Sequence, residues 1–159
     1  MSMHLPSPSE LVPILVVLNA AAVFGAAGVA WHLQLAGYPL HLRVGRSGFP
    51  RYLRAHRGAT ALVLAPLVLA DFLTSWILLL LPHDPVTTIF VWCGALSALL
   101  VTGVTLGVMR RASRRLAEAF EARAFRRLMA GNCVRANVWS MHAALIAVML
   151  VRAMLVRAV

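Results

Sequence analysis

Four long apolar stretches dominate this sequence, at residues 11–35, 58–81, 85–109 and 133–155. A helix needs about 20 mostly apolar residues to cross the hydrocarbon core of a bilayer, and each stretch is long enough. In lipid a segment of this kind must satisfy its backbone internally, so each stretch is predicted to be a helix. The chain is 61% apolar and 13% charged, whereas soluble domains have roughly 45–50% and about 25%. We therefore expect an all-α, four-transmembrane-helix bundle, with residues 1–159 forming a single integral membrane domain.

The connections between the stretches predict how the helices are oriented. Pro82 and Pro85 lie in a short connection between the second and third stretches, which indicates a tight turn between antiparallel helices. The other two connections, 36–57 and 110–132, carry twelve of the 15 arginines. Because basic residues collect in cytoplasmic loops, we expect a multi-pass protein of the bacterial inner membrane with both basic loops in the cytoplasm and both termini outside. The lipid bilayer, and anionic headgroups at the arginines, are the expected partners.

The second basic loop, 110–132, has the pattern of an amphipathic helix. An apolar residue recurs every fourth position, and charged residues such as Arg114, Arg115, Glu118 and Glu121 lie elsewhere around the helix. Such a helix is expected to lie at the membrane interface against anionic lipid. Nucleic acid is not an expected partner, because the loop is short and offers no exposed aromatic residues for stacking. The apolar positions are Leu116, Phe120, Ala124 and Leu128.

A weak internal repeat relates the two halves of the chain. The segment 49–56 before the second stretch resembles the segment 125–132 before the fourth, at an offset of 76 residues. Each half would then be a helix, a basic loop and a returning helix in the same orientation. This is a parallel repeat of two helical hairpins.

Polar residues inside the apolar stretches are the strongest functional signal. An ionisable side chain in the middle of a bilayer costs at least roughly 2.5–3.5 kcal/mol and persists where it has a partner. At about 100° per residue, the polar residues of the second and fourth stretches each fall on one side of their helix. We predict that these two polar seams face each other, so that Asp71 meets His142. The seams are His56, Thr60, Asp71 and Thr74, and Asn132, Arg135, Trp139 and His142.

Imidazoles beside a carboxylate suit a first-row transition metal such as copper, iron or zinc. The available ligands are His32, His56, Asp71 and His142, although no two of these histidines have the spacing of a metal motif. His32 and His56 could also be the two axial ligands of a haem. The same seam is equally compatible with a proton or substrate path, or with a structural polar network.

The chain resembles a family of small four-helix bacterial integral membrane proteins that are loosely similar to the anthrone oxygenase-like membrane proteins. That resemblance implies a four-helix fold and, by analogy, oxidation of a lipophilic aromatic substrate. It is carried by Tyr38-Pro39, Phe49-Pro50, Tyr52, His56, Pro66, Asp71, Arg126-Arg127-Leu128, Asn132, Arg135 and Trp139.

The chain departs from this family pattern at several positions. The family usually has Glu at the position of Asp71, and a Pro-Leu-His where residues 111–113 are Arg-Ala-Ser. Its Asn-Trp pair is Asn132-Cys133, and its arginine three residues after Trp139 is His142. The histidine that the family places before the second loop helix is therefore absent here.

Two functional hypotheses follow. The first is a metal- or haem-dependent membrane oxidoreductase or oxygenase that acts on a lipophilic substrate. In this hypothesis Arg135 and Asn132 position an oxygen-bearing group of the substrate, and Trp139 and Tyr38 line an apolar pocket. The second is non-catalytic: a subunit of a membrane complex or homo-oligomer, or a small solute or proton carrier, whose polar seam only holds the helices together.

Overall fold

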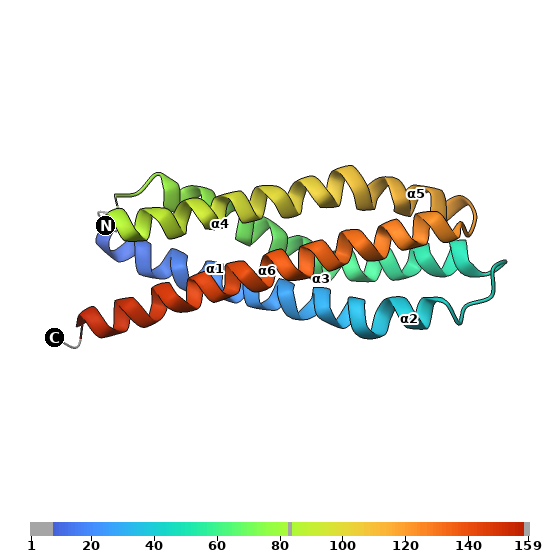
Figure 1. Ribbon diagram of the computed structural model, residues 1–159, viewed down its shortest axis with the longest axis horizontal. Helices are drawn as coiled ribbons and strands as arrows, with labels where there is room; N and C mark the ends of the chain where they lie inside the picture. Colours follow the sequence, from blue (N-terminus) through green and yellow to red (C-terminus); the bar gives the residue numbers. More distant parts are fainter. Residues whose placement is uncertain (1–7, 83, 158–159) are drawn as a thin grey trace, which may run out of the picture.

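The protein forms four long antiparallel helical rods, seen in a computed structural model that describes residues 8–82 and 84–157 (Figure 1). The first rod consists of α1 (Pro8–His32), the π-helical turn η1 (Leu33–Gly37) and α2 (Tyr38–His41). The second is α3 (Phe49–Leu79). The third consists of α4 (Pro85–Val104), the π-helical turn η2 (Thr105–Met109) and α5 (Arg110–Glu118), and the fourth is α6 (Ala122–Arg157). The predicted all-α four-helix bundle is confirmed.

All four rods are long enough and apolar enough to cross a membrane, over Leu11–His41, Phe49–Leu79, Val86–Glu118 and Ala122–Leu155. Their outer surfaces carry large apolar side chains such as Leu62, Leu80 and Leu96, which are more than half exposed. A soluble protein rarely exposes this much contiguous apolar surface, whereas lipid accepts it. The fold therefore defines a multi-pass membrane protein of four helices.

The four rods pack as a square. α1 and α4 each pack against both α3 and α6, so that α3 and α6 face each other across the centre of the bundle. On α1 the inner surface consists of small residues, including the fully buried Val23, Ala26 and Ala30. Small side chains allow the helix backbones to approach closely, which favours association within lipid.

The two ends of the bundle differ in composition. One end holds the described ends of α1 and α6 and the short α3–α4 turn (Figure 1). There Asp84 caps α4 by accepting hydrogen bonds from the backbone N–H groups of Val86 and Thr87, at 3.1 and 3.2 Å. Hydrogen bonds from Thr87 lower the pKa of Asp84. The bond from the Thr87 side chain has the larger effect, and the bond from its backbone N–H has the smaller one. We call the opposite end, with the α2–α3 and α5–α6 connections, the arginine-rich end.

The two basic loops are shorter than predicted. The expected loop 36–57 is mostly helical, because the first rod continues to His41 and α3 begins at Phe49. The expected interfacial helix over 110–132 is wrong, because the chain breaks at Ala119, whose backbone is extended, and residues on either side prolong the third and fourth rods. Its apolar stripe packs inside the protein instead of against lipid, with Leu116, Ala124 and Leu128 buried.

The two halves of the chain share a local irregularity. A π-helical turn lies near the arginine-rich end of the first rod, and another begins 72 residues later in the third rod, at Thr105. The aromatic rings of Phe49 and Phe125, which open the two repeated segments, lie 6.1 Å apart. This offset of 72 residues differs by four from the 76 of the predicted repeat, so the repeat stays a prediction. π-helical turns inside α-helices occur frequently at functional sites.

Candidate functional site

Asp71 lies at the centre of the bundle and receives donors from three helices. Its side chain on α3 is buried, with 1% of the residue exposed. Oδ2 accepts a hydrogen bond of 3.0 Å from the indole Nε1 of Trp139 on α6. Oδ1 accepts from Ser75 Oγ at 3.2 Å and from Asn19 Nδ2 at 3.3 Å. Nδ1 of His142 lies 3.4 Å from Oδ1, within ion-pair distance but without hydrogen-bond geometry. The predicted meeting of Asp71 with His142 is confirmed, whereas His56 and Thr60 of the same predicted seam line the groove described below.

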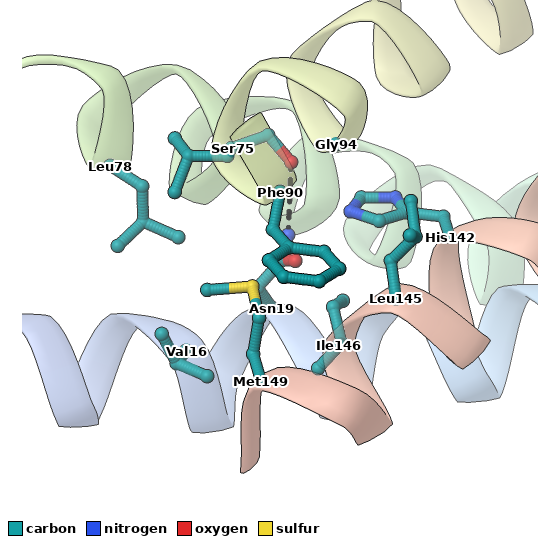
Figure 2. A pocket seen from close by; sticks show the side chains of 11 residues that line it. Val16, Asn19, Ser75, Leu78, Phe90, Gly94, His142, Leu145, Ile146 and Met149 are labelled. Carbon is teal, nitrogen blue, oxygen red and sulfur yellow. Dashed lines mark hydrogen bonds between the residues drawn. The ribbon is translucent and has the colours of Figure 1, made fainter. Parts of the chain in front are cut away.

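Asn19 connects α1 to this network, a connection that the sequence analysis missed. Its Nδ2 donates to Thr74 Oγ1 at 2.8 Å and to Ser75 Oγ at 3.1 Å. Figure 2 shows Asn19 reaching across from α1 to Ser75 on α3. The sequence did contain a signal for this contact, because Asn19 is the one residue with a side-chain amide in the apolar run 11–30. In lipid, an isolated amide of this kind pairs with another helix.

A very small cavity borders this network. It has a volume of about 10 Å³ and is lined by Asn19, Ser75, Gly94 and His142, among mainly apolar side chains. Figure 2 shows the imidazole of His142 beside Gly94 of α4. A cavity of this volume has room for about one water molecule. Asp71 and its donors therefore form a closed polar network that holds α1, α3 and α6 together.

A second network continues along α6 toward the arginine-rich end. The guanidinium of Arg135 lies 5.2 Å from the ring centroid of Trp139. Nη2 of Arg135 donates to Asn132 Oδ1 at 3.0 Å, and Nη1 donates to Thr105 Oγ1 of η2 at 3.3 Å. Asn132 in turn donates to the Gln34 Oε1 of η1 at 3.0 Å. The predicted polar seam of α6 is therefore buried along its whole length, and it joins both π-helical turns.

A large groove opens beside Arg135, between α3 on one side and α4, η2 and α5 on the other. Its volume is about 860 Å³. The apolar wall on α3 runs from Ala61 to Phe72, and Arg135 and Tyr38 contribute polar groups to the lining. His56 and several hydroxyl groups also line it. These hydroxyl-bearing residues are Thr60, Thr102, Thr105 and Ser113.

The four predicted metal ligands do not come together. His56 and Asp71 are 15 residues apart on α3, which separates them by about 22 Å along a straight helix. His32 lies on the exposed surface of α1. Within residues 8–82 and 84–157, no group of three or more His, Cys, Asp or Glu side chains could hold a metal ion. The predicted set of His32, His56, Asp71 and His142 as one metal site is therefore wrong, because only Asp71 and His142 meet.

His56 belongs to an aromatic cluster with His41 and Tyr52. Its ring centroid lies 4.4 Å from that of His41, and it stacks with Tyr52 at 5.8 Å. His41 is fully buried, and its Nδ1 donates a hydrogen bond to the Gly37 carbonyl. His56 lines the groove and His32 is not among its lining residues, so the haem pair of His32 and His56 stays a prediction. His41 is not among the candidate ligands that the sequence analysis identified.

The four residues predicted to contact a substrate divide into two pairs. Arg135 and Tyr38 line the groove. Asn132 and Trp139 have no exposed surface and lie behind Arg135, where the amide accepts a hydrogen bond from the guanidinium and the indole contacts it. Asn132 and Trp139 are thus placed to position Arg135. Gln34, which accepts a hydrogen bond from Asn132, and Thr105, which accepts one from Arg135, were not identified from the sequence.

Comparison of the chain with protein-family models, with curated proteins and with solved structures finds no match in any of the three. The resemblance to the anthrone oxygenase-like membrane proteins therefore stays a prediction. The geometry described above is the basis for the functional proposal that follows.

Gly94 allows His142 to reach the centre of the bundle. A Cβ atom added at Gly94 would lie 2.7 Å from His142 Nε2, whereas a Cβ at Gly103 on the same helix would meet nothing within 4 Å. We expect Gly94→Ala to displace His142 and lower the free energy of unfolding in detergent by about 1–3 kcal/mol. Gly103→Ala should leave it unchanged or raise it by up to about 1 kcal/mol. Equal effects of the two substitutions would show that His142 is not held against α4.

Proposed function

We propose that this protein binds a lipophilic small molecule with an oxygen-bearing head group, inside the membrane, in the groove between α3 and α4. The observation that carries this proposal is the groove itself, with its volume of about 860 Å³. Ligand sites typically measure about 300–1,000 Å³ and combine apolar walls with a few polar groups. A groove of this kind on an apolar helical surface is reached from the lipid and suits a molecule that is dissolved there.

The lining of the groove supports an amphiphilic ligand. Leu64, Val68 and Phe72 of α3 form an apolar wall, and Leu106 and Met109 lie on the η2 side. Polar groups gather toward the arginine-rich end, where Arg135, Thr105 and Ser113 line the groove. A ligand would therefore place its chain against α3 and its head toward the polar groups.

Membrane oxidoreductase chemistry is not part of this proposal. It was predicted to run on a metal held by His56, Asp71 and His142, and the described residues include no group of three or more His, Cys, Asp or Glu side chains that could hold a metal ion. The alternative, a haem held by His32 and His56, stays a prediction. The residues of the groove, led by Arg135 and Tyr38, support recognition of a ligand. Whether the protein acts alone or within a membrane complex does not alter this proposal.

We also propose the orientation that the arginines predict, in the bacterial inner membrane, with the arginine-rich end in the cytoplasm and in contact with anionic headgroups. This end carries Arg43, Arg46, Arg51, Arg54 and Arg57 and the seven arginines of 110–127, whereas Arg152 lies near the other end.

Binding in the groove can be tested by photolabelling the purified protein with diazirine-bearing hexadecanol and hexadecanoate. We expect labelled peptides from the walls of the groove, identified by mass spectrometry. Ala65→Phe adds a ring to a residue that lines the groove and should remove most of this labelling. Leu62→Phe, on the same helix at a position that is 80% exposed and outside the groove, should leave it intact. Labelling spread evenly over the apolar surface with both probes would contradict the proposed function.

The orientation can be tested in cells with single cysteines, in a background where Cys93 and Cys133 are replaced by alanine. A cysteine at Ser47, in the exposed α2–α3 connection, should react with an impermeant maleimide only after the cells are opened. A cysteine at Pro82, in the exposed α3–α4 turn, should react in intact cells. The reverse pattern would place the arginine-rich end outside.

A further inference from the structure

Arg135 is a buried cation without a negative partner in the described part of the chain. It lines the groove, yet only 5% of the residue is exposed. The ion pairs seen among the described residues are those of Asp71 with His142 and of Asp84 with Arg152. A buried charge is costly unless an opposite charge and hydrogen bonds compensate for it.

The hydrogen bonds of Arg135 leave its charge uncompensated. A guanidinium has five N–H donors, and here Asn132 and Thr105 each accept one hydrogen bond from the terminal nitrogens. Both acceptors are neutral, and Nε has no partner in the described structure. The Trp139 ring stabilises the cation by a cation–π contact without neutralising it. No side chain in the described ranges therefore supplies a negative charge to this guanidinium.

We propose that the ligand of the groove is a single-chain amphiphile with an oxyanion head, which binds at Arg135 with its chain along α3. This inference rests on the proposed function and names the chemical class of its ligand. Carboxylates and phosphates match the planar, forked donors of a guanidinium, and such charge-assisted hydrogen bonds are roughly twice as strong as neutral ones. A neutral alcohol or carbonyl would leave the charge of Arg135 unbalanced.

The length of the groove along α3 matches that of an acyl chain. On α3 the lining residues from Ala61 to Phe72 extend over about 16 Å of helix, the length scale of a long acyl chain. Near the arginine-rich end this wall consists of small residues, Gly58, Ala61 and Ala65, so a chain can lie close to the helix backbone. A volume of about 860 Å³ falls in the range of single small ligands.

Two exposed arginines offer a rival site for a head group. Arg57 and Arg110 line the outer part of the groove and are exposed, so a membrane phospholipid could place its phosphate there and leave Arg135 unused. Arg54 is engaged otherwise, since its Nη1 donates to the Ala117 carbonyl at 2.8 Å. Substitutions of the buried Arg135 and of the exposed Arg57 and Arg110 therefore distinguish a single-chain amphiphile from a membrane phospholipid.

The test measures equilibrium binding of radiolabelled hexadecanoate to the full-length protein in detergent, at mildly alkaline pH where the acid is ionised. Unlabelled hexadecanoate should compete about tenfold or more better than hexadecanol, which is the effect expected of one charge-assisted hydrogen bond. Arg135→Gln should abolish this preference, and Arg135→Lys should retain part of it. The double substitution Arg57→Gln and Arg110→Gln is the matched control, and it should change the preference by less than about twofold.

The outcomes separate this inference from the proposed function. Equal competition by hexadecanol and hexadecanoate, both blocked by Ala65→Phe, would overturn the oxyanion head and leave the groove as a binding site. Loss of binding in the Arg57 and Arg110 double variant but not in Arg135→Gln would overturn the placement at Arg135. Displacement of hexadecanoate by phosphatidylglycerol and not by hexadecyl phosphate would identify a membrane phospholipid instead. The preference of the unmodified protein for acid over alcohol is informative even where Arg135→Gln fails to fold.

Discussion

The structure depends on the buried carboxylate of Asp71, which lipid cannot solvate and which the protein must therefore satisfy from within. Its oxygens accept hydrogen bonds from Asn19 of α1, Ser75 of α3 and Trp139 of α6, and His142 lies beside them. Each donor has to come from a particular position on its helix. A charged or polar group in the membrane interior thus fixes the rotation of each of the three helices about its own axis. Apolar packing alone would allow a wider range of rotations.

A series of contacts connects Asp71 to the groove. Trp139 donates its N–H to Asp71 and presents its ring to Arg135, which in turn donates to Asn132. The π-helical turns η1 and η2 supply Gln34 and Thr105 to the far end of this chain of contacts. Arg135 is therefore held in place by neutral groups alone. The structural network and the proposed binding groove are therefore neighbouring parts of one arrangement.

The sequence predicted the parts of this arrangement that follow from helical periodicity and from the cost of polar groups in lipid. The four helices, the inward seam of α6 and the meeting of Asp71 with His142 all follow from these two rules. The metal site failed for a geometric reason, since His56 and Asp71 share a helix and are too far apart along it. The groove could not be predicted, because it depends on where α3 and α4 separate. The π-helical turns have no sequence signature that we could use.

The central claim is that the hydrogen bond between Trp139 and Asp71 joins α6 to α3 across the bundle. A double-mutant cycle of Asp71→Val and Trp139→Phe measures the coupling energy between these two side chains. The quantity determined for each variant is its free energy of unfolding in mixed micelles. Hydrogen bonds between membrane helices average about 0.6 kcal/mol, and the buried carboxylate should raise the coupling to about 1 kcal/mol or more. The control pair, Asp71→Val with Trp92→Phe on the exposed surface of α4, should be additive. Additivity of the first pair would contradict the account.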